Sequence, residues 1–269
     1  MRFALITDVH FGPRAYHGGK LRKLTDRASE LSQHFVERMN RLFRPELVVN
    51  LGDVIEDQSR SVDIENYSQF TSILAGLDAR VAHVAGNHDL INLSEEDLST
   101  LWGHQGELHY SFDLGGLHFL VLRTDETKNV AVRLPAEQIA FAERDLASTS
   151  LPSIVLMHHP ASETRVEGNR WFDQAPHLCR VVERRALRRT LEGSGKVLAV
   201  FNGHMHWNHL DVIAGIPYIT VQSLVENLDE DVPGRAAAAF AVCDVDERRL
   251  VVTVHGEETV RYQVERSSR

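Results

Sequence analysis

Short runs of apolar, largely β-branched residues recur along the chain, and several of them end directly in Asp, Asn or His. Runs of this length, bounded by polar residues or glycine, are typical of buried strands. The expected strands cover residues 3–7, 47–51, 81–85, 117–122, 154–157 and 197–201. Segments with helical periodicity lie between several of them, so the sequence predicts an α/β architecture with a core that is at least partly parallel.

Four segments carry helix signals. Residues 26–43 have an apolar stripe, Ser94 and Asp97 resemble a helix N-cap with its acidic partner, Pro135 suits a first helical turn, and a further helix is expected over residues 178–191. Arg184, Arg185, Arg188 and Arg189 on this last helix form either a phosphate-binding patch or a solvent-exposed face, and we favour the exposed face. Runs at 209–213, 216–222, 238–244 and 249–255 have short connections that indicate antiparallel strands.

Composition excludes several classes of protein. The formal net charge of −9 argues against a non-specific nucleic-acid binder, and the 43% hydrophobic and 25% charged residues are those of a globular chain. Cys179 and Cys243 are too few for a disulfide framework, and we expect both to be packing residues. Asp8 ends the first apolar run too early for a signal peptide, and residues 212–225 are too polar for a membrane span. We therefore expect one cytoplasmic domain over residues 1–269.

Chemistry-bearing residues gather at the ends of five expected strands. Each motif alone has an ordinary structural explanation, such as a turn or a packing pair. Gly203-His204-Met205-His206 is the most specific, because two imidazoles two residues apart after a strand rarely serve packing. Open α/β sheets bind ligands at the carboxyl ends of their strands, so the motifs together indicate one site. They are Asp8-Val9-His10, Gly52-Asp53, Gly86-Asn87-His88-Asp89, His158-His159 and Gly203-His204-Met205-His206.

In this order the motifs resemble those of the calcineurin-like metallophosphoesterases, D-x-H, G-D, G-N-H-[DE], H and G-H-x-H, over residues 8–206. The chain length and the His158-His159-Pro160 form of the fourth motif resemble the class III branch of cyclic-nucleotide and glycerophosphodiester phosphodiesterases. The resemblance implies an α/β/β/α sandwich of two mixed sheets flanked by helices. It also implies a phosphoric ester hydrolase, most simply a phosphodiesterase with additional phosphomonoesterase activity, in which a metal-activated hydroxide attacks phosphorus.

The resemblance further implies a role for each motif residue. Asp53 would bridge two metal ions; Asp8, His10 and His206 would complete one site, and Asn87, His158 and His204 the other. Ligands of this kind suit Mn, Fe, Zn or Co. His88 would contact the phosphate and protonate the leaving group, and Asp89 would orient the His88 ring or, alternatively, cap a helix. His159 is either a partner of a ligand or a ligand in place of His158, and the position of His158 directly after the strand favours His158.

Two loops are expected to form the rim of the site, residues 11–25 and 161–177, and their basic and aromatic residues suit a small anionic or aromatic phosphate ester. We expect neither a nucleic-acid duplex nor a membrane as partner, and residues 216–255 offer candidate strand edges for a homodimer. Two other functions compete with hydrolysis of small esters. A metal-poor scaffold of the same fold is disfavoured because His88 and all presumptive ligands are present, and a nuclease is disfavoured by the negative charge.

Overall fold

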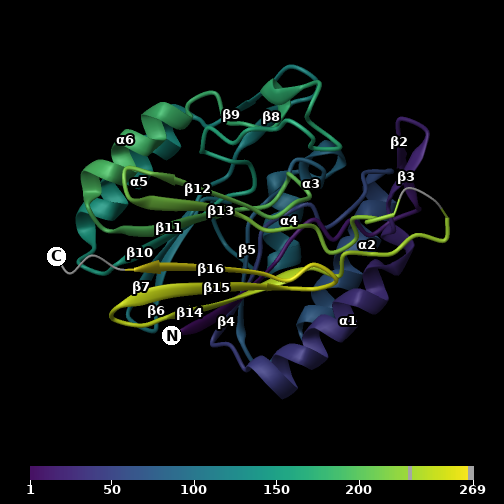
Figure 1. Ribbon diagram of the computed structural model, residues 1–269, viewed down its shortest axis with the longest axis horizontal. Helices are drawn as coiled ribbons and strands as arrows, with labels where there is room; N and C mark the ends of the chain where they lie inside the picture. The colour runs from purple at the N-terminus through teal and green to yellow at the C-terminus, as the bar shows by residue number, and fades with distance from the viewer. Residues whose placement is uncertain (230–231, 266–269) are drawn as a thin grey trace.

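The computed structural model describes residues 1–229 and 232–265. Its main elements form two six-stranded sheets packed face to face, with helices on both outer surfaces (Figure 1). This is the predicted α/β/β/α sandwich. Within the described residues, no helix is both long enough and apolar enough to cross a membrane.

The first sheet has the order β16-β15-β14-β1-β4-β5. Strands β1, β4 and β5 are parallel to one another, and β14, β15 and β16 continue the sheet in antiparallel fashion from β1. The strand bounds are β1 (Arg2–Ile6), β4 (Leu47–Asn50), β5 (Arg80–His83), β14 (Phe240–Val245), β15 (Arg249–His255) and β16 (Val260–Glu265). Strand β16 was not among the expected strands, although its residues alternate between partly buried and exposed, which is the usual pattern of a half-buried strand.

The second sheet has the order β12-β13-β11-β10-β7-β6, in which β7, β10, β11 and β13 are parallel. Antiparallel strands β6 and β12 form its two edges. The bounds are β6 (Tyr110–Leu114), β7 (Leu117–Val121), β10 (Ser153–Leu156), β11 (Val197–Asn202), β12 (His209–Ile213) and β13 (Ile216–Thr220). Strands β13, β14 and β15 are therefore interior, so residues 216–255 do not supply the strand edges expected for a homodimer; the late edges are β12 and β16.

Two small hairpins stand outside the sheets. They are formed by β2 (Ala15–His17) with β3 (Lys20–Lys23) and by β8 (Asp125–Thr127) with β9 (Ala131–Arg133). The β2–β3 hairpin projects from one end of the sandwich, at the right of Figure 1. It occupies most of the predicted rim loop 11–25.

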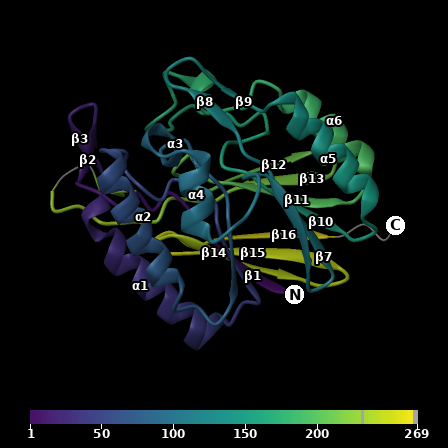
Figure 2. The same ribbon diagram turned by 180° about the vertical axis from the view of Figure 1, so that it is seen from behind.

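Helices cover both outer faces, as the view from behind shows (Figure 2). Helices α1 (Ala28–Arg38), α2 (Arg60–Leu74), α3 (Asp89–Asn92) and α4 (Glu95–Trp102) lie on the first sheet, and α5 (Ala136–Ser148) and α6 (Arg184–Ser194) on the second. Short turns of 3₁₀ helix (Thr25–Arg27, Pro176–Leu178) and one π-helical segment (Met39–Phe43) complete the set. The predicted helix 26–43 is thus three consecutive segments, and the predicted capping box of Ser94 and Asp97 is present.

The predicted helix 178–191 begins only at Arg184, because Val181 pairs with Val132 in an isolated bridge. Arg185 and Arg189 are exposed, as we favoured, but Arg184 and Arg188 do not lie on a simple solvent-exposed face. The Arg184 and Arg188 guanidinium groups both bind the Glu163 carboxylate, and Arg188 is only 8% exposed. This cluster therefore anchors the loop that carries Glu163.

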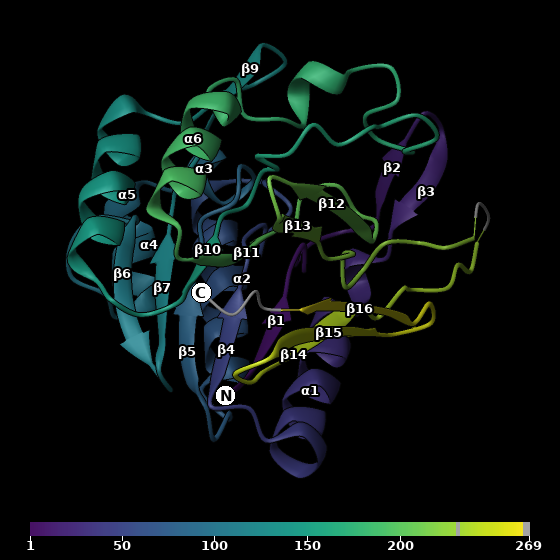
Figure 3. The same cartoon turned by 60° about the vertical axis from the view of Figure 1, so that its left-hand side comes forward.

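The core has three layers. The middle layer, between the sheets, packs strand residues such as Phe3, Phe119 and Phe201 edge to face. Strands buried on both faces explain why their sequences are continuous apolar runs rather than alternating ones. Cys179 and Cys243 are both buried free thiols, as expected of packing residues. Figure 3 shows how the packed sheets align the carboxyl ends of β1, β4, β5, β10 and β11 toward one region.

Candidate metal centre

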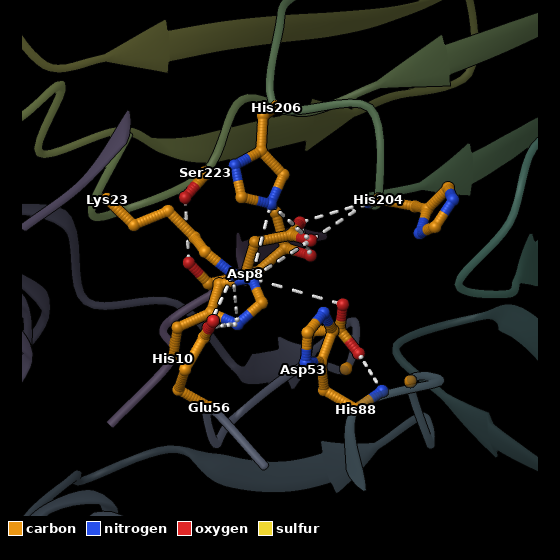
Figure 4. Close-up of polar contacts among 12 residues, drawn as sticks. Asp8, His10, Lys23, Asp53, Glu56, His88, His204, His206 and Ser223 are labelled. Carbon is orange, nitrogen blue, oxygen red and sulfur yellow. Dashed lines mark hydrogen bonds and ion pairs between the residues drawn. The ribbon is translucent and has the colours of Figure 1, made fainter. Parts of the chain in front are cut away.

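The predicted ligands come from five strand ends in two different sheets. Figure 4 shows Asp8, His10, Asp53, His204 and His206 gathered in one place. Asp8, His10 and His206 form one group of buried side chains whose potential ligand atoms lie within 4.8 Å of one another. Asp8, Asp53 and His158 form a second such group, and His204 joins His158 and His159 in a third. The groups share members, so they make up one continuous cluster.

Five of the predicted ligands have left-handed backbone conformations. The φ angles are 50° at Asp8, 47° at His10, 55° at Asp53, 66° at His204 and 51° at His206. Such a conformation in a residue other than glycine costs about 1–3 kcal/mol and persists only where the surrounding structure enforces it. Strain of this kind concentrates at functional sites, so the backbone independently marks this cluster as one.

Two motif positions require glycine because neighbouring residues lie too close to the backbone for a Cβ atom. A Cβ atom on Gly86 would collide with the backbone nitrogen and carboxylate of Asp53, and one on Gly203 would collide with Thr7 and the Asp8 carboxylate. The glycines of the third and fifth motifs thus allow neighbouring strand ends to close around the acidic residues.

The two central carboxylates are held on several sides. Asp8 accepts hydrogen bonds from the Thr7 hydroxyl at 2.6 Å and from the backbone N–H of His204 at 3.0 Å. Asp53 accepts one from the backbone N–H of His88 at 2.9 Å. Burial by itself would raise the pKa of Asp53, but the charges of His158 and His88 outweigh it and hold that pKa well below its usual range. Both residues are therefore anionic at neutral pH.

Each of the four predicted imidazole ligands has one ring nitrogen tied to an acceptor. The Nδ1 of His10 lies 3.0 Å from the Glu56 carboxylate, and that of His206 lies 2.8 Å from Glu226. His158 donates from Nδ1 to the Leu51 carbonyl at 2.8 Å, and His204 from Nε2 to the Leu178 carbonyl at 3.3 Å. A ring tied in this way has its other nitrogen left as the candidate metal ligand. In His10 and His206 these other nitrogens, both Nε2, lie 3.2 Å from each other.

The donor set fits two metal ions. The cluster contains carboxylate oxygens and imidazole nitrogens, and the Asn87 amide is adjacent to His88, whose backbone N–H binds Asp53. With no thiolate among the predicted ligands, this is the ligand chemistry of Mn, Fe, Zn or Co sites. Among the described residues, the buried atoms Asn87 Oδ1, His158 Nε2 and His159 Nε2 have no hydrogen-bond partner. Buried polar atoms are normally satisfied, and bound cations would satisfy these.

His159 belongs to the third group, with His158 and His204, and not to the group that contains Asp53. Its Nδ1 is 2.7 Å from the Thr124 hydroxyl, and its unpartnered Nε2 is 3.9 Å from a carboxylate oxygen of Glu126. By contrast, His158 Nε2 is only 3.1 Å from Asp53 Oδ2. This geometry favours His158 as the ligand that shares Asp53.

The prediction that Asp89 orients the His88 ring is wrong. The Asp89 carboxylate accepts hydrogen bonds from the backbone N–H groups of Asp53 at 3.0 Å, Val54 at 2.8 Å and Gly86 at 2.9 Å. The group that holds His88 is Asp57, whose Oδ1 lies 2.5 Å from His88 Nδ1. The Asp89 carboxylate instead links the Gly52-Asp53 motif to the start of its own motif at Gly86.

This role predicts a large stability effect. Asp89→Ala leaves three buried N–H groups without a partner, each worth about 1–3 kcal/mol, so the free energy of unfolding should fall by at least about 3 kcal/mol. Urea titration followed by circular dichroism measures it. Asp244→Ala, which removes only a half-exposed partner of Arg2, is the control and should cost at most about 1 kcal/mol. Equal stability of the two variants would contradict the assignment.

Three acidic residues of the site were absent from the sequence predictions: Glu56, Asp57 and Glu226. The first two follow Gly52-Asp53 closely, and this extra pair of carboxylates beside a recognised motif was a usable signal. Glu226 has no such signal, because it lies 20 residues beyond His206 and meets it only through folding.

Both predicted rim loops do border the cluster. In the first, Lys23 is buried and contacts the Glu56 carboxylate. In the second, Trp171 packs its ring 5.2 Å from that of His206 and 5.1 Å from that of His17 on the β2–β3 hairpin. The two loops therefore meet over the Asp8 side of the cluster. The opposite side opens beside His88 into a pocket of about 740 Å³ that Leu90, Ile91, Arg123 and Glu126 help to line.

The sequence profile described as calcineurin-like phosphoesterase matches residues 1–208, which contain every motif described above. The chain belongs to this family. It is 27% identical over 165 residues to a probable cyclic nucleotide phosphodiesterase of Synechococcus sp.; the match covers 60% of this chain and 58% of the relative. The chain thus spans less than two thirds of the length of that relative.

Solved structures show the same fold for this calcineurin-like phosphoesterase. A dimetal phosphatase from Danio rerio superposes with a TM-score of 0.81 at 18% identity, covering 99% of both chains. GAP50, the anchor in the inner membrane complex of Plasmodium, superposes with a TM-score of 0.62 at 12% identity, covering 100% of this chain and 90% of that one. At these identities the likeness concerns the fold alone.

Proposed function

We propose that this calcineurin-like phosphoesterase is a dinuclear metal-dependent phosphodiesterase that acts on small phosphate esters of the cyclic-nucleotide or glycerophosphodiester class. The observation that carries the proposal is the set of four buried imidazoles around Asp8 and Asp53, each with one ring nitrogen tied to an acceptor outside this group of ligands. The family match and the cyanobacterial relative support the same class of reaction.

In this proposal Asp53 would be shared by two metal ions, with Asp8, His10 and His206 as ligands on one side and Asn87, His158 and His204 on the other. Bound ions of this kind would supply a nucleophilic hydroxide at neutral pH and neutralise charge on the phosphoryl oxygens. The chain contributes the anionic Asp8 and Asp53, the imidazole nitrogens of the four histidines, and a buried setting in which charges interact strongly.

His88 is the proposed general acid. As the phosphorus–oxygen bond to the leaving alcohol breaks, a proton moves from His88 Nε2 to the departing oxygen, and water supplies the oxygen that joins phosphorus. Asp57 holds Nδ1 and so leaves Nε2 as the proton donor. Burial by itself would lower the pKa of His88, but the charge of Asp53 and the hydrogen bond to Asp57 outweigh it and raise that pKa, which favours the protonated ring. The pocket beside His88 has room for the leaving alcohol.

Turnover assays test the proposal. Purified protein, loaded with Mn²⁺ and analysed for metal content, is assayed with cyclic nucleotides, glycerophosphodiesters and simple monoesters. We expect diester hydrolysis to exceed monoester hydrolysis. Metal-loaded protein that hydrolyses neither class would overturn the proposal and favour a scaffold, and preferential cleavage of DNA would favour a nuclease.

Chelation should inactivate the protein reversibly without unfolding it. The three-layer core is large, and the acidic residues of the site already have hydrogen-bond partners within the protein, so folding does not depend on metal as it does in small zinc domains. After treatment with EDTA, the far-UV circular dichroism spectrum should be unchanged, and activity should return with Mn²⁺. A global loss of secondary structure would contradict this expectation.

A further inference from the structure

Four consecutive residues of the second rim loop, Asn169-Arg170-Trp171-Phe172, pack against the turn that carries the last two predicted ligands. We call them the clamp segment. The Phe172 ring lies 4.7 Å from that of His204, and the Trp171 ring lies 5.2 Å from that of His206. Between them, the Asn169 side-chain amide donates a hydrogen bond to the carbonyl of Met205 at 2.8 Å. The clamp segment thus contacts each residue of the turn.

This turn needs external support. His204 and His206 both have left-handed φ angles, 66° and 51°, which side chains with a Cβ adopt only under constraint. On the inner side, the Asp8 carboxylate accepts the backbone N–H of His204. On the outer side, the contacts come from the clamp segment. The contacts with Asp8 and with the clamp segment together account for the left-handed conformations of His204 and His206, which are unfavourable in residues that carry a Cβ atom.

Asn169 is the residue around which the clamp segment is built. It is only 4% exposed, and its Oδ1 accepts the backbone N–H groups of Trp171 at 2.9 Å and Phe172 at 3.0 Å. One amide side chain therefore fixes the backbone of both aromatic residues while its nitrogen holds Met205. The clamp segment is also tied down by Arg170, which donates to the carbonyl of Asn227 at 2.7 Å.

Trp171 adds a polar connection to the ring contact. Its indole Nε1 donates to Glu226 Oε2 at 3.1 Å, and the same oxygen lies 2.8 Å from His206 Nδ1. The Trp171 indole therefore holds the Glu226 carboxylate in place, and this carboxylate in turn orients the His206 ring. Hydrogen-bond partners beyond the ligands orient metal-binding histidines, and their loss typically weakens metal affinity 10- to 100-fold.

We propose that Asn169 and Trp171 are positioning residues for the metal centre, Asn169 by holding the His204–His206 turn and Trp171 by holding His206 through Glu226. This inference rests on the proposed function, because it takes His204 and His206 as metal ligands. It assigns the second rim loop a task beyond contact with substrate: the loop maintains metal affinity.

The chain offers a matched pair of tryptophans for the test. Trp171→Phe keeps an aromatic ring and removes one donor to Glu226. Trp207→Phe makes the same change at a buried indole nitrogen that has no hydrogen-bond partner within the described residues. Mn²⁺ is titrated into each metal-free protein by isothermal calorimetry. We expect one of the two Mn²⁺ affinities to weaken roughly tenfold in Trp171→Phe and neither to change in Trp207→Phe. Asn169→Ala should weaken both affinities.

The selectivity of the loss is a readout that a purely structural role would not move. Trp171 reaches the metal centre through Glu226 and His206, so Trp171→Phe should weaken one Mn²⁺ affinity and leave the other at its wild-type value. Wild-type affinity for both Mn²⁺ ions in Trp171→Phe, an equal loss at both, or an equal loss in Trp207→Phe would overturn the inference. Wild-type protein that binds no Mn²⁺ would overturn the proposed metal centre itself, which separates the two failures.

Discussion

Asp53→Asn is expected to reduce turnover of phosphate esters to background and to lose at least one metal ion. In the structure the Asp53 Oδ2 atom lies 3.1 Å from His158 Nε2 and 3.9 Å from His10 Nε2, between the two sets of predicted ligands. A carboxylate there has two anionic oxygens to share between cations, whereas an amide has one neutral oxygen and binds them far less well. Metal analysis by mass spectrometry and an ester assay measure both effects.

Asp244→Asn, which makes the same chemical change at a half-exposed position on β14, is the matched control and should keep its metal and its activity. Thermal unfolding of Asp53→Asn shows whether the variant is folded. A folded Asp53→Asn protein with the metal content and activity of the wild type would remove the dinuclear proposal.

His88→Ala should separate the chemical step from metal binding. The ring is not among the proposed ligands, so both metal ions should remain, while kcat falls roughly 10²- to 10⁴-fold, the range for a lost general acid. The loss should depend on the leaving group. A nitrophenolate leaves readily without a proton, so its esters should suffer least, whereas esters of glycerol or ribose should suffer most.

The measurement is the rate for a series of esters spanning the pKa of the leaving alcohol, in wild type and variant. A steeper dependence in His88→Ala supports general acid catalysis, and equal slopes would show that His88 acts only by stabilising charge.

Asp57→Asn should lower kcat in the same way as His88→Ala, but by a smaller factor. Loss of the Asp57 charge lowers the pKa of His88. Because the acid works only when protonated, the alkaline limb of the profile of kcat against pH should move to lower pH.

The features of this protein that depend only on residues close together in the sequence were predicted from the sequence. Buried strands are continuous apolar runs, and the Ser94–Asp97 capping box is a four-residue signal, so both were predicted. That the motifs form one site followed from their places at strand ends, because parallel strands in an α/β sheet end at a common edge. The seven proposed ligands among them came from the resemblance to the calcineurin-like family. By contrast, helix α6 begins at Arg184 rather than at residue 178, because Val181 forms a bridge with the distant Val132. Sequence periodicity did not indicate this bridge.

Only the tertiary structure decided how those ligands are held. The partner of His88 is Asp57, 31 residues away, rather than the adjacent Asp89, and the partner of His206 is Glu226 in a different segment. The left-handed conformations of Asp8, Asp53 and His204 likewise run against local preference. Sequence periodicity reports which face of an element is buried, but hydrogen bonds between distant segments and enforced backbone strain depend on how the two sheets pack. For this protein the sequence therefore indicated the seven proposed ligands and His88, whereas the packing of the sheets determined their orientation and brought Glu56, Asp57 and Glu226 to them as partners.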